Sequence, residues 1–114
     1  MTPGADLAYL IGYEPIVTER LTLLVVGTDG HAALLAPRLE RGEAEKARGA
    51  AAVAISDWSD GSDQFAAAAQ LLGANARYAI TDTTMALHVL GLQRARPDTQ
   101  YVAMSVALPL LGAV

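Results

Sequence analysis

Residues 20–40 read "RLTLLVVGTDGHAALLAPRLE", two apolar runs that flank a short polar turn. The first run covers residues 20–27 and the second covers residues 31–36. The Asp29-Gly30 pair between them is typical of a tight hairpin turn, because both residue types tolerate positive φ angles. The pattern therefore predicts two neighbouring antiparallel strands, of which Pro37 closes the second.

Further elements are predicted on both sides of this hairpin. Short apolar runs bounded by polar or glycine residues indicate strands at residues 7–11, 51–55, 77–80 and 100–105. Helix-forming or helically spaced residues indicate helices at 38–48, at 64–73 and from the capping residues 81–84 onward. The last two helices have predicted apolar faces formed by Phe65, Ala68, Ala69 and Leu72, and by Met85, Val89 and Leu92.

The order of these elements is a hairpin followed by repeated alternation of helix and strand. Such an order predicts an α/β fold whose sheet is antiparallel at its start and more parallel later. The length of 114 residues fits one domain. We expect Gly73 to cap the helix at 64–73, and the apolar tail at 106–114 to be helical from Pro109.

Composition limits the classes of partner. Hydrophobic residues make up 53% of the chain, which is enough for one core. The formal net charge of -4 argues against a phosphate-binding surface, so we expect no nucleic-acid partner. The chain has no cysteine, which excludes disulfides and thiolate metal sites. Without a signal-peptide pattern or an apolar stretch of about 20 residues, a soluble cytoplasmic domain with no membrane contact is expected.

The acidic stretch "DWSDGSD" at residues 57–63 has two interpretations. Calcium loops of the EF-hand type place carboxylates at alternate positions and close with a glutamate at the twelfth position. Here the aspartates are three residues apart, and the twelfth position from Asp57 is Ala68. The second interpretation is a turn in which Asp60, Ser62 or Asp63 caps the following helix, and we favour it.

Few other side chains suggest chemistry. His31 and His88 are the only histidines, and neither has a nearby carboxylate at metal-ligand spacing. We predict that His31 is exposed and that His88 is a packing residue at the edge of the core. Nucleophile elbows, glycine-rich dinucleotide motifs and phosphate loops are all missing from the sequence. The residues do not complete an active site.

Three further residues could contact a ligand or a partner. Arg38, with Glu40, follows a predicted strand end, although exposed charge at a helix start is ordinary. Trp58 is the one tryptophan and lies in a polar stretch. It is therefore either a local plug or a contact for a partner, and the sequence alone leaves both open.

Three segments together resemble a known family. They are "YLIGY" at 9–13, the hairpin with "PRLE" at 20–40, and the "DWSDGSD" stretch before a helix. In order and spacing they resemble the N-terminal domain of creatinase and prolidase-type proteins, a group that includes Xaa-Pro dipeptidases and aminopeptidases P. The similarity extends over essentially all 114 residues. One departure is Ile11, where threonine is common in the family.

The resemblance implies a ribonuclease-H-like α/β domain, a mixed sheet with helices on both faces. Residues 1–114 would be a non-catalytic domain, and the longer protein a hydrolase that cleaves the peptide bond before proline. A C-terminal catalytic domain, missing from this chain, would hold two divalent metal ions on two aspartates, a histidine and two glutamates. Parent proteins of this kind are commonly homodimers in which this domain covers the partner's active site. The apolar end at Val114 would then be a cut.

The loop at residues 13–19, "YEPIVTE", is the main site candidate. Its polar residues and Pro15 predict exposure, and loops on a rigid sheet often carry binding groups. In the proteins that this chain resembles, the neighbouring region faces the partner subunit's catalytic pocket. Tyr13, Glu14 and Glu19 are therefore candidates for a substrate entrance, with Arg38 and Trp58 as weaker ones.

Two other functions stay open at the level of sequence. The chain could be a self-contained binding module of the same fold, for a small ligand or a protein. The longer protein could also act on creatine-like substrates or be an inactive relative, because a fold does not determine chemistry. The sequence that follows this domain in the gene would separate these alternatives, since only a peptidase would carry the metal-ligand array.

Overall fold

The computed structural model describes residues 1–15 and 17–107. Strands β1 (Leu23–Val26) and β2 (Ala32–Pro37) form the predicted antiparallel hairpin, with Leu23 opposite Leu35. The turn differs in detail from the prediction. Of its residues only Gly30 has a positive φ, 86°, and the Gly27 N–H donates to the His31 carbonyl across a three-residue loop. A glycine at that position suits such a loop, so Asp29 does not need the strained conformation.

Strand β3 (Ala54–Trp58) lies parallel to β2, which makes the sheet order β1-β2-β3. The strand was predicted at residues 51–55, but Ala50–Ala52 form a short 3-10 helix, η2, and the strand runs on to Trp58. Its register places Trp58 opposite Pro37. Pairing with β2 thus extends the strand through residues 56–58, "SDW". The hydrogen bonds to β2 and the burial of side chains outweigh the preference of these residues for a turn.

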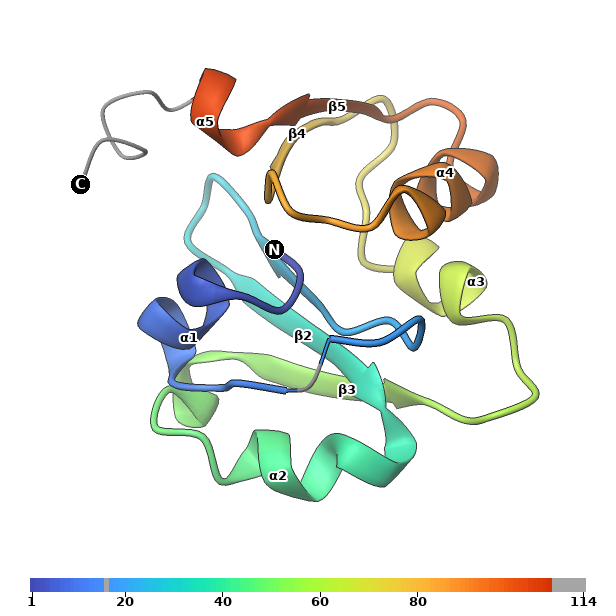
Figure 1. Cartoon of the computed structure of the whole chain (residues 1–114). Coiled ribbons are helices and arrows are strands. Elements are labelled where there is room, and N and C mark those ends of the chain that lie inside the picture. Colours follow the sequence, from blue (N-terminus) through green and yellow to red (C-terminus); the bar gives the residue numbers. More distant parts are fainter. Residues whose placement is uncertain (16, 108–114) are drawn as a thin grey trace.

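Strands β4 (Arg77–Ile80) and β5 (Gln100–Ala103) pair parallel as a second, two-stranded sheet. Both strands were predicted, and β4 has the predicted bounds. The chain therefore has the expected α/β class and becomes parallel after the hairpin, but its strands form two sheets. Figure 1 shows β4 and β5 on one side of the molecule, apart from the β1–β3 sheet.

The first element is the clearest correction. Residues 7–11 were predicted as a strand, yet Ala5–Ile11 form the helix α1. Leu7 and Ile11 are both buried, one helical turn apart, and Gly12 ends the helix in the left-handed region with its N–H bonded to the Ala8 carbonyl. A short apolar run cannot distinguish a strand from a helix until a core selects one face. Here that face packs against the β1–β2 hairpin.

The other helices were predicted with imperfect bounds. The charged segment divides into the 3-10 helix η1 (Arg38–Glu40) and α2 (Arg41–Glu45). Helix α3 (Gln64–Ala69) ends before Gly73, which is not its cap. Helix α4 (Ala86–Ala95) buries His88, Gly91 and Leu92, while Met85 remains exposed. The last helix, α5 (Met104–Ala107), includes Met104 and Ser105, which were expected to extend a strand, and the helix predicted from Pro109 onward lies outside the described residues.

Two core clusters cover the two faces of the larger sheet. Side chains alternate along β1 and β2, so Leu23 and Leu35 join one cluster while Leu24 and Leu34 join the other. Helices α3 and α4 contribute Ala68 and Leu92 to the first cluster, and Leu72 joins it from the turn that follows α3. Helices α1 and α2 contribute Leu7, Ile11 and Ala44 to the second. Helices therefore pack on both faces of the sheet, as predicted (Figure 1). No helix in the part of the chain that the structure describes is long and apolar enough to cross a membrane.

Candidate functional site

Tyr13 and Glu14 border a cavity of about 420 Å³ at the C-terminal end of α1. The opposite wall comes from η1 and α2 and includes Glu40, Glu43 and Lys46. The Tyr13 side chain is buried, whereas Glu14 is exposed. Burial raises the pKa of Tyr13, and the negative charges of Glu40 and Glu43 raise it further. The phenol therefore stays neutral and the cavity has an acidic rim.

Two glycines position this cavity. Gly12 adopts φ 72° and ends α1, which turns the chain toward Tyr13. Gly49 donates its N–H to the Ile11 carbonyl at 2.8 Å. A β-carbon at Gly49 would lie 2.7 Å from the Ile11 α-carbon, so only glycine allows this close approach. The end of α1 and the segment after α2 are thereby held together beside the cavity.

Glu19 lies apart from this cavity. Its backbone carbonyl accepts hydrogen bonds from Gln64 Nε2 at 3.2 Å and from His88 Nε2 at 3.0 Å. Glu19 does not line the Tyr13 cavity among the described residues. The structure therefore brings Tyr13 and Glu14 together and places Glu19 near α3 and α4. The proximity of Glu40 and Glu43 to Tyr13 was not predicted, because these residues come from η1 and α2, some thirty residues further along the chain.

Arg38 belongs to an ion-pair group at the end of β3. Asp57 accepts hydrogen bonds from Arg41 at 2.8 Å and from Arg38 Nε at 3.1 Å. Arg41 and Arg38 together hold the pKa of the Asp57 carboxyl below its ordinary value. The Arg38 side chain is still 66% exposed. It is thus anchored by Asp57 while part of its guanidinium faces solvent.

Trp58 is a packing residue. It is 7% exposed and belongs to the core cluster that contains Leu21, Leu35 and Leu72. Its indole N–H donates to the Leu21 carbonyl at 2.8 Å, and the Arg20 guanidinium lies 5.8 Å from the ring centre. The sequence left open whether Trp58 packs locally or contacts a partner, and in the structure it packs locally in the core.

Every carboxylate of the 57–63 stretch already has a partner. Asp57 pairs with Arg38 and Arg41, and Asp60 pairs with Arg20 at 2.5 Å. Asp63 caps α3 by accepting hydrogen bonds from the backbone N–H groups of Phe65 and Ala66. The capping interpretation is confirmed for Asp63, and these three acids point to different partners rather than to one cation.

The histidines are also separate. His31 Nδ1 lies 2.9 Å from the Asp29 carboxylate in the exposed hairpin turn. His88, on α4, is buried, and its ring packs tilted against the ring of Phe65, so its predicted packing role is confirmed. Among residues 1–15 and 17–107, no three histidine, aspartate or glutamate side chains lie close enough together to hold a metal ion. The described residues do not fit a metal centre.

Comparison with known proteins places this geometry in a family. No family model matches the chain. A probable dipeptidase PepE from Mycobacterium tuberculosis is 40% identical over 97 residues, which cover 83% of this chain and 26% of the relative. The crystal structure of dipeptidase PepE from Mycobacterium ulcerans superposes with a TM-score of 0.83 at 38% identity, covering 96% of this chain and 30% of that one.

A third comparison concerns the fold alone. The creatinase/prolidase N-terminal domain of an X-Pro dipeptidase from Streptococcus pyogenes superposes with a TM-score of 0.70 at 20% identity. The match covers 96% of this chain and 80% of that domain. The chain spans only about 26–30% of the length of the dipeptidases that it matches more closely in sequence. On sequence and fold together, the chain belongs to the N-terminal domain family of creatinase and prolidase-type proteins.

Proposed function

We propose that this chain is the non-catalytic N-terminal domain of a cytoplasmic Xaa-Pro dipeptidase or aminopeptidase, a metal-dependent hydrolase that works as a homodimer. In this proposal the domain assists dimerisation and covers the partner subunit's active site. One observation supports it most strongly: the likeness to a dipeptidase covers 96% of this chain but only 30% of the matched chain. The remainder of such a protein is where the chemistry would lie.

The proposal assigns no bond-breaking step to residues 1–114. Peptide hydrolysis in a metallopeptidase needs an activated, metal-bound water held by several protein ligands. The aspartates of the 57–63 stretch and the two histidines are instead engaged in a helix cap, ion pairs and packing contacts. The two metal ions expected for the family therefore belong to the C-terminal catalytic domain, which is the first partner that we propose for this chain.

The activity of the longer protein is the first test. Purified full-length protein with manganese is expected to hydrolyse alanyl-proline, whereas residues 1–114 under the same conditions are expected to release no proline. The physical reason is that residues 1–15 and 17–107 contain no group of side chains that could hold a metal ion. Failure of the full-length protein on several Xaa-Pro dipeptides would reject the proposed activity. Hydrolysis by residues 1–114 alone would reject the non-catalytic role.

The entrance role rests on Tyr13 and Glu14. These residues, with Glu40 and Glu43, form an acidic rim around a cavity. Negative charge at the mouth of a site attracts the ammonium group of a free dipeptide and raises its local concentration. Glu19, which was predicted together with Tyr13 and Glu14, lies outside this rim and becomes a weaker candidate, and Arg38 remains one. Buried Trp58 supports the end of β3, next to the group in which Asp57 holds Arg38.

A charge-neutral variant of the rim tests this role. We expect Tyr13→Phe with Glu14→Gln and Glu43→Gln to lower kcat/KM of the full-length protein for alanyl-proline at least fivefold, about 1 kcal/mol of transition-state stabilisation. The loss should shrink at high salt, because screening weakens steering. Glu45→Gln is the matched control: it lies on α2 but does not line the cavity. A variant that stays dimeric and within about twofold of wild type would end the entrance hypothesis.

A further inference from the structure

The Tyr13 cavity contains an unused hydrogen-bonding group as well as acidic side chains. Tyr13 is only 6% exposed, and no described residue forms a hydrogen bond with its hydroxyl. Burial, and then the charges of Glu40 and Glu43, raise the pKa of this phenol, which places the hydroxyl close to both carboxylates. Among the described residues, the one unpartnered side-chain atom that is sealed from solvent is Arg96 Nε. The Tyr13 hydroxyl is therefore open to the cavity that it lines.

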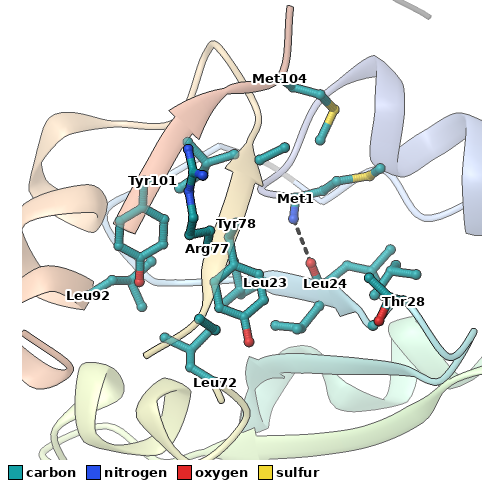
Figure 2. Close-up of a pocket in the computed structure, with 16 residues that line it drawn as sticks. Met1, Leu23, Leu24, Thr28, Leu72, Arg77, Tyr78, Leu92, Tyr101 and Met104 are labelled. Carbon is teal, nitrogen blue, oxygen red and sulfur yellow. Dashed lines mark hydrogen bonds between the residues drawn. The ribbon is translucent and has the colours of Figure 1, made fainter. Parts of the chain in front are cut away.

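The tyrosines of the larger cavity differ in this respect. That cavity measures about 540 Å³ and lies between β1 and β4, with Tyr78 and Tyr101 in its wall (Figure 2). The Tyr78 hydroxyl accepts a hydrogen bond from the Gly73 N–H at 2.8 Å, and the Tyr101 hydroxyl accepts one from Thr99 Oγ1 at 3.0 Å. No acidic side chain of the described residues lines the larger cavity. The combination of an unpartnered hydroxyl with carboxylates is thus found at Tyr13 and not there.

The carboxylates around the Tyr13 cavity are free to take a ligand. Among the described residues, neither Glu14 nor Glu40 forms an ion pair. Glu43 pairs with Lys46 Nζ at 3.4 Å, but the two side chains are 74% and 76% exposed. Such an exposed pair contributes little to stability, because water competes with it and both side chains lose rotamer freedom. An incoming cation can therefore replace Lys46 at small cost.

The spacing of these acceptors favours an extended organic cation over a metal ion. Among residues 1–15 and 17–107, no three acidic or histidine side chains lie close enough together to share one metal ion. A guanidinium group is planar, presents five N–H donors and can bond to separate carboxylates. The Tyr13 hydroxyl oxygen supplies a further acceptor. The cavity of about 420 Å³ also falls within the range of small-molecule sites, roughly 300–1,000 Å³.

The chain's own arginine beside the cavity does not fill it. Arg48 packs next to Gly12, where its Nε would lie 3.2 Å from a β-carbon at the glycine. Arg48 is nevertheless not among the described residues that line the cavity, and Lys46 is the one basic side chain among them. The acidic cavity therefore has room for a guanidinium group from outside the domain.

We propose that the Tyr13 cavity binds the guanidinium group of an arginine side chain, with Glu40 and Glu43 as carboxylate partners and the Tyr13 hydroxyl as a further acceptor. The source of the arginine rests on the proposed function: it is the first residue of an Arg-Pro substrate in the full-length dimer. The acidic rim attracts the ammonium group of any free dipeptide, whereas the cavity distinguishes a substrate that carries a guanidinium from one that does not. The domain thus determines which Xaa-Pro dipeptides the enzyme prefers.

Titration of residues 1–114 with methylguanidinium tests the site without the catalytic domain. The measurement is the backbone amide NMR shift of Gly12, Tyr13 and Glu43, at an ionic strength held constant with sodium chloride. N-methylurea is the control, because it has the same shape and no charge. We expect methylguanidinium to bind at least about tenfold more tightly, since hydrogen bonds from a charged donor to a carboxylate are stronger. Equal binding of the two probes, or no saturable shift with methylguanidinium, would overturn the proposal.

Two variants of the same chain test the individual contacts. Tyr13→Phe keeps the buried ring and removes the hydroxyl, and we expect it to weaken methylguanidinium binding about threefold. Glu40→Gln keeps the shape and removes the charge, and at least about a fivefold loss is expected. Glu45→Gln is the control on α2 outside the cavity lining, with an expected change below about twofold. An equal loss in Glu45→Gln would show that the probe follows the net charge of the domain, which would contradict a site at Tyr13.

The full-length protein tests the source of the arginine. Its kcat/KM is expected to be at least about fivefold higher for arginyl-proline than for alanyl-proline, and Glu40→Gln should lower that ratio at least about threefold. A ratio that Glu40→Gln leaves unchanged would reject the substrate assignment. So would a full-length protein that does not bind methylguanidinium although residues 1–114 do, because another part of the protein then fills the cavity. If the full-length protein hydrolyses no Xaa-Pro dipeptide, the proposed function fails, and the methylguanidinium titration still decides the site.

Discussion

Replacing Trp58 with alanine is expected to lower the free energy of unfolding by about 4 kcal/mol, the range found for large aromatic residues removed from a core. The ring packs in the cluster with Leu21, Leu35 and Leu72, and its loss would leave a cavity at the end of β3. The Leu21 carbonyl would also lose the indole N–H that it now accepts at 2.8 Å. An unsatisfied buried acceptor adds to the cost.

Urea denaturation followed by far-ultraviolet circular dichroism measures this loss, because the chain has no other tryptophan to report by fluorescence. Trp58→Phe is the companion variant. It keeps most of the volume but not the hydrogen bond, so we expect a loss of about 1–2 kcal/mol. It also gives a result if the alanine variant does not fold, since domains of this size have only about 5–15 kcal/mol of stability. A cost below about 1 kcal/mol for Trp58→Ala would restore the partner-contact interpretation.

The second large effect is expected at Gly49. Gly49→Ala should destabilise the domain by about 2 kcal/mol, as overpacking of a close contact does. The added β-carbon would lie 2.7 Å from the Ile11 α-carbon and 3.2 Å from the Ile11 carbonyl oxygen. Backbone atoms cannot rotate aside as a side chain would. In the variant, the end of α1 must therefore move away, which lengthens the hydrogen bond from the Gly49 N–H to the Ile11 carbonyl.

Gly42→Ala is the matched control for this position. Gly42 lies within α2, and a β-carbon there would meet no atom within 4 Å. Alanine should raise stability by about 0.5–1 kcal/mol, because it reduces the conformational freedom of the unfolded chain. Thermal unfolding of both variants beside the wild type gives the comparison. If Gly49→Ala melts at or above the wild-type temperature, the contact between α1 and the segment after α2 does not hold the Tyr13 cavity in place.

Local sequence patterns were sufficient to predict an element where the segment makes its hydrogen bonds and contacts with residues close to it in the sequence. The hairpin was predictable because its two apolar runs and its turn are adjacent in sequence and pair with each other. The bounds of β4 and the cap at Asp63 follow from equally local patterns. The family resemblance likewise came from the order of short motifs, and the comparisons bear it out.

Other features depended on partners far along the chain. The run at 7–11 became a helix because Leu7 and Ile11 pack together against the hairpin. Trp58 became a core residue because β3 pairs with β2 in a register that buries it. No local pattern separates these outcomes from a strand or from an exposed loop residue.

The sequence by itself determined the α/β class, the hairpin and the family of this domain, since each rests on patterns that a short segment carries alone. Only the tertiary structure decided that Tyr13 lies beside Glu40 and Glu43, that Glu19 lies apart from that group, and that the strands form two sheets. The physical reason is that these features are contacts between distant segments. They exist only after burial of the two core clusters has set the order and register of the strands.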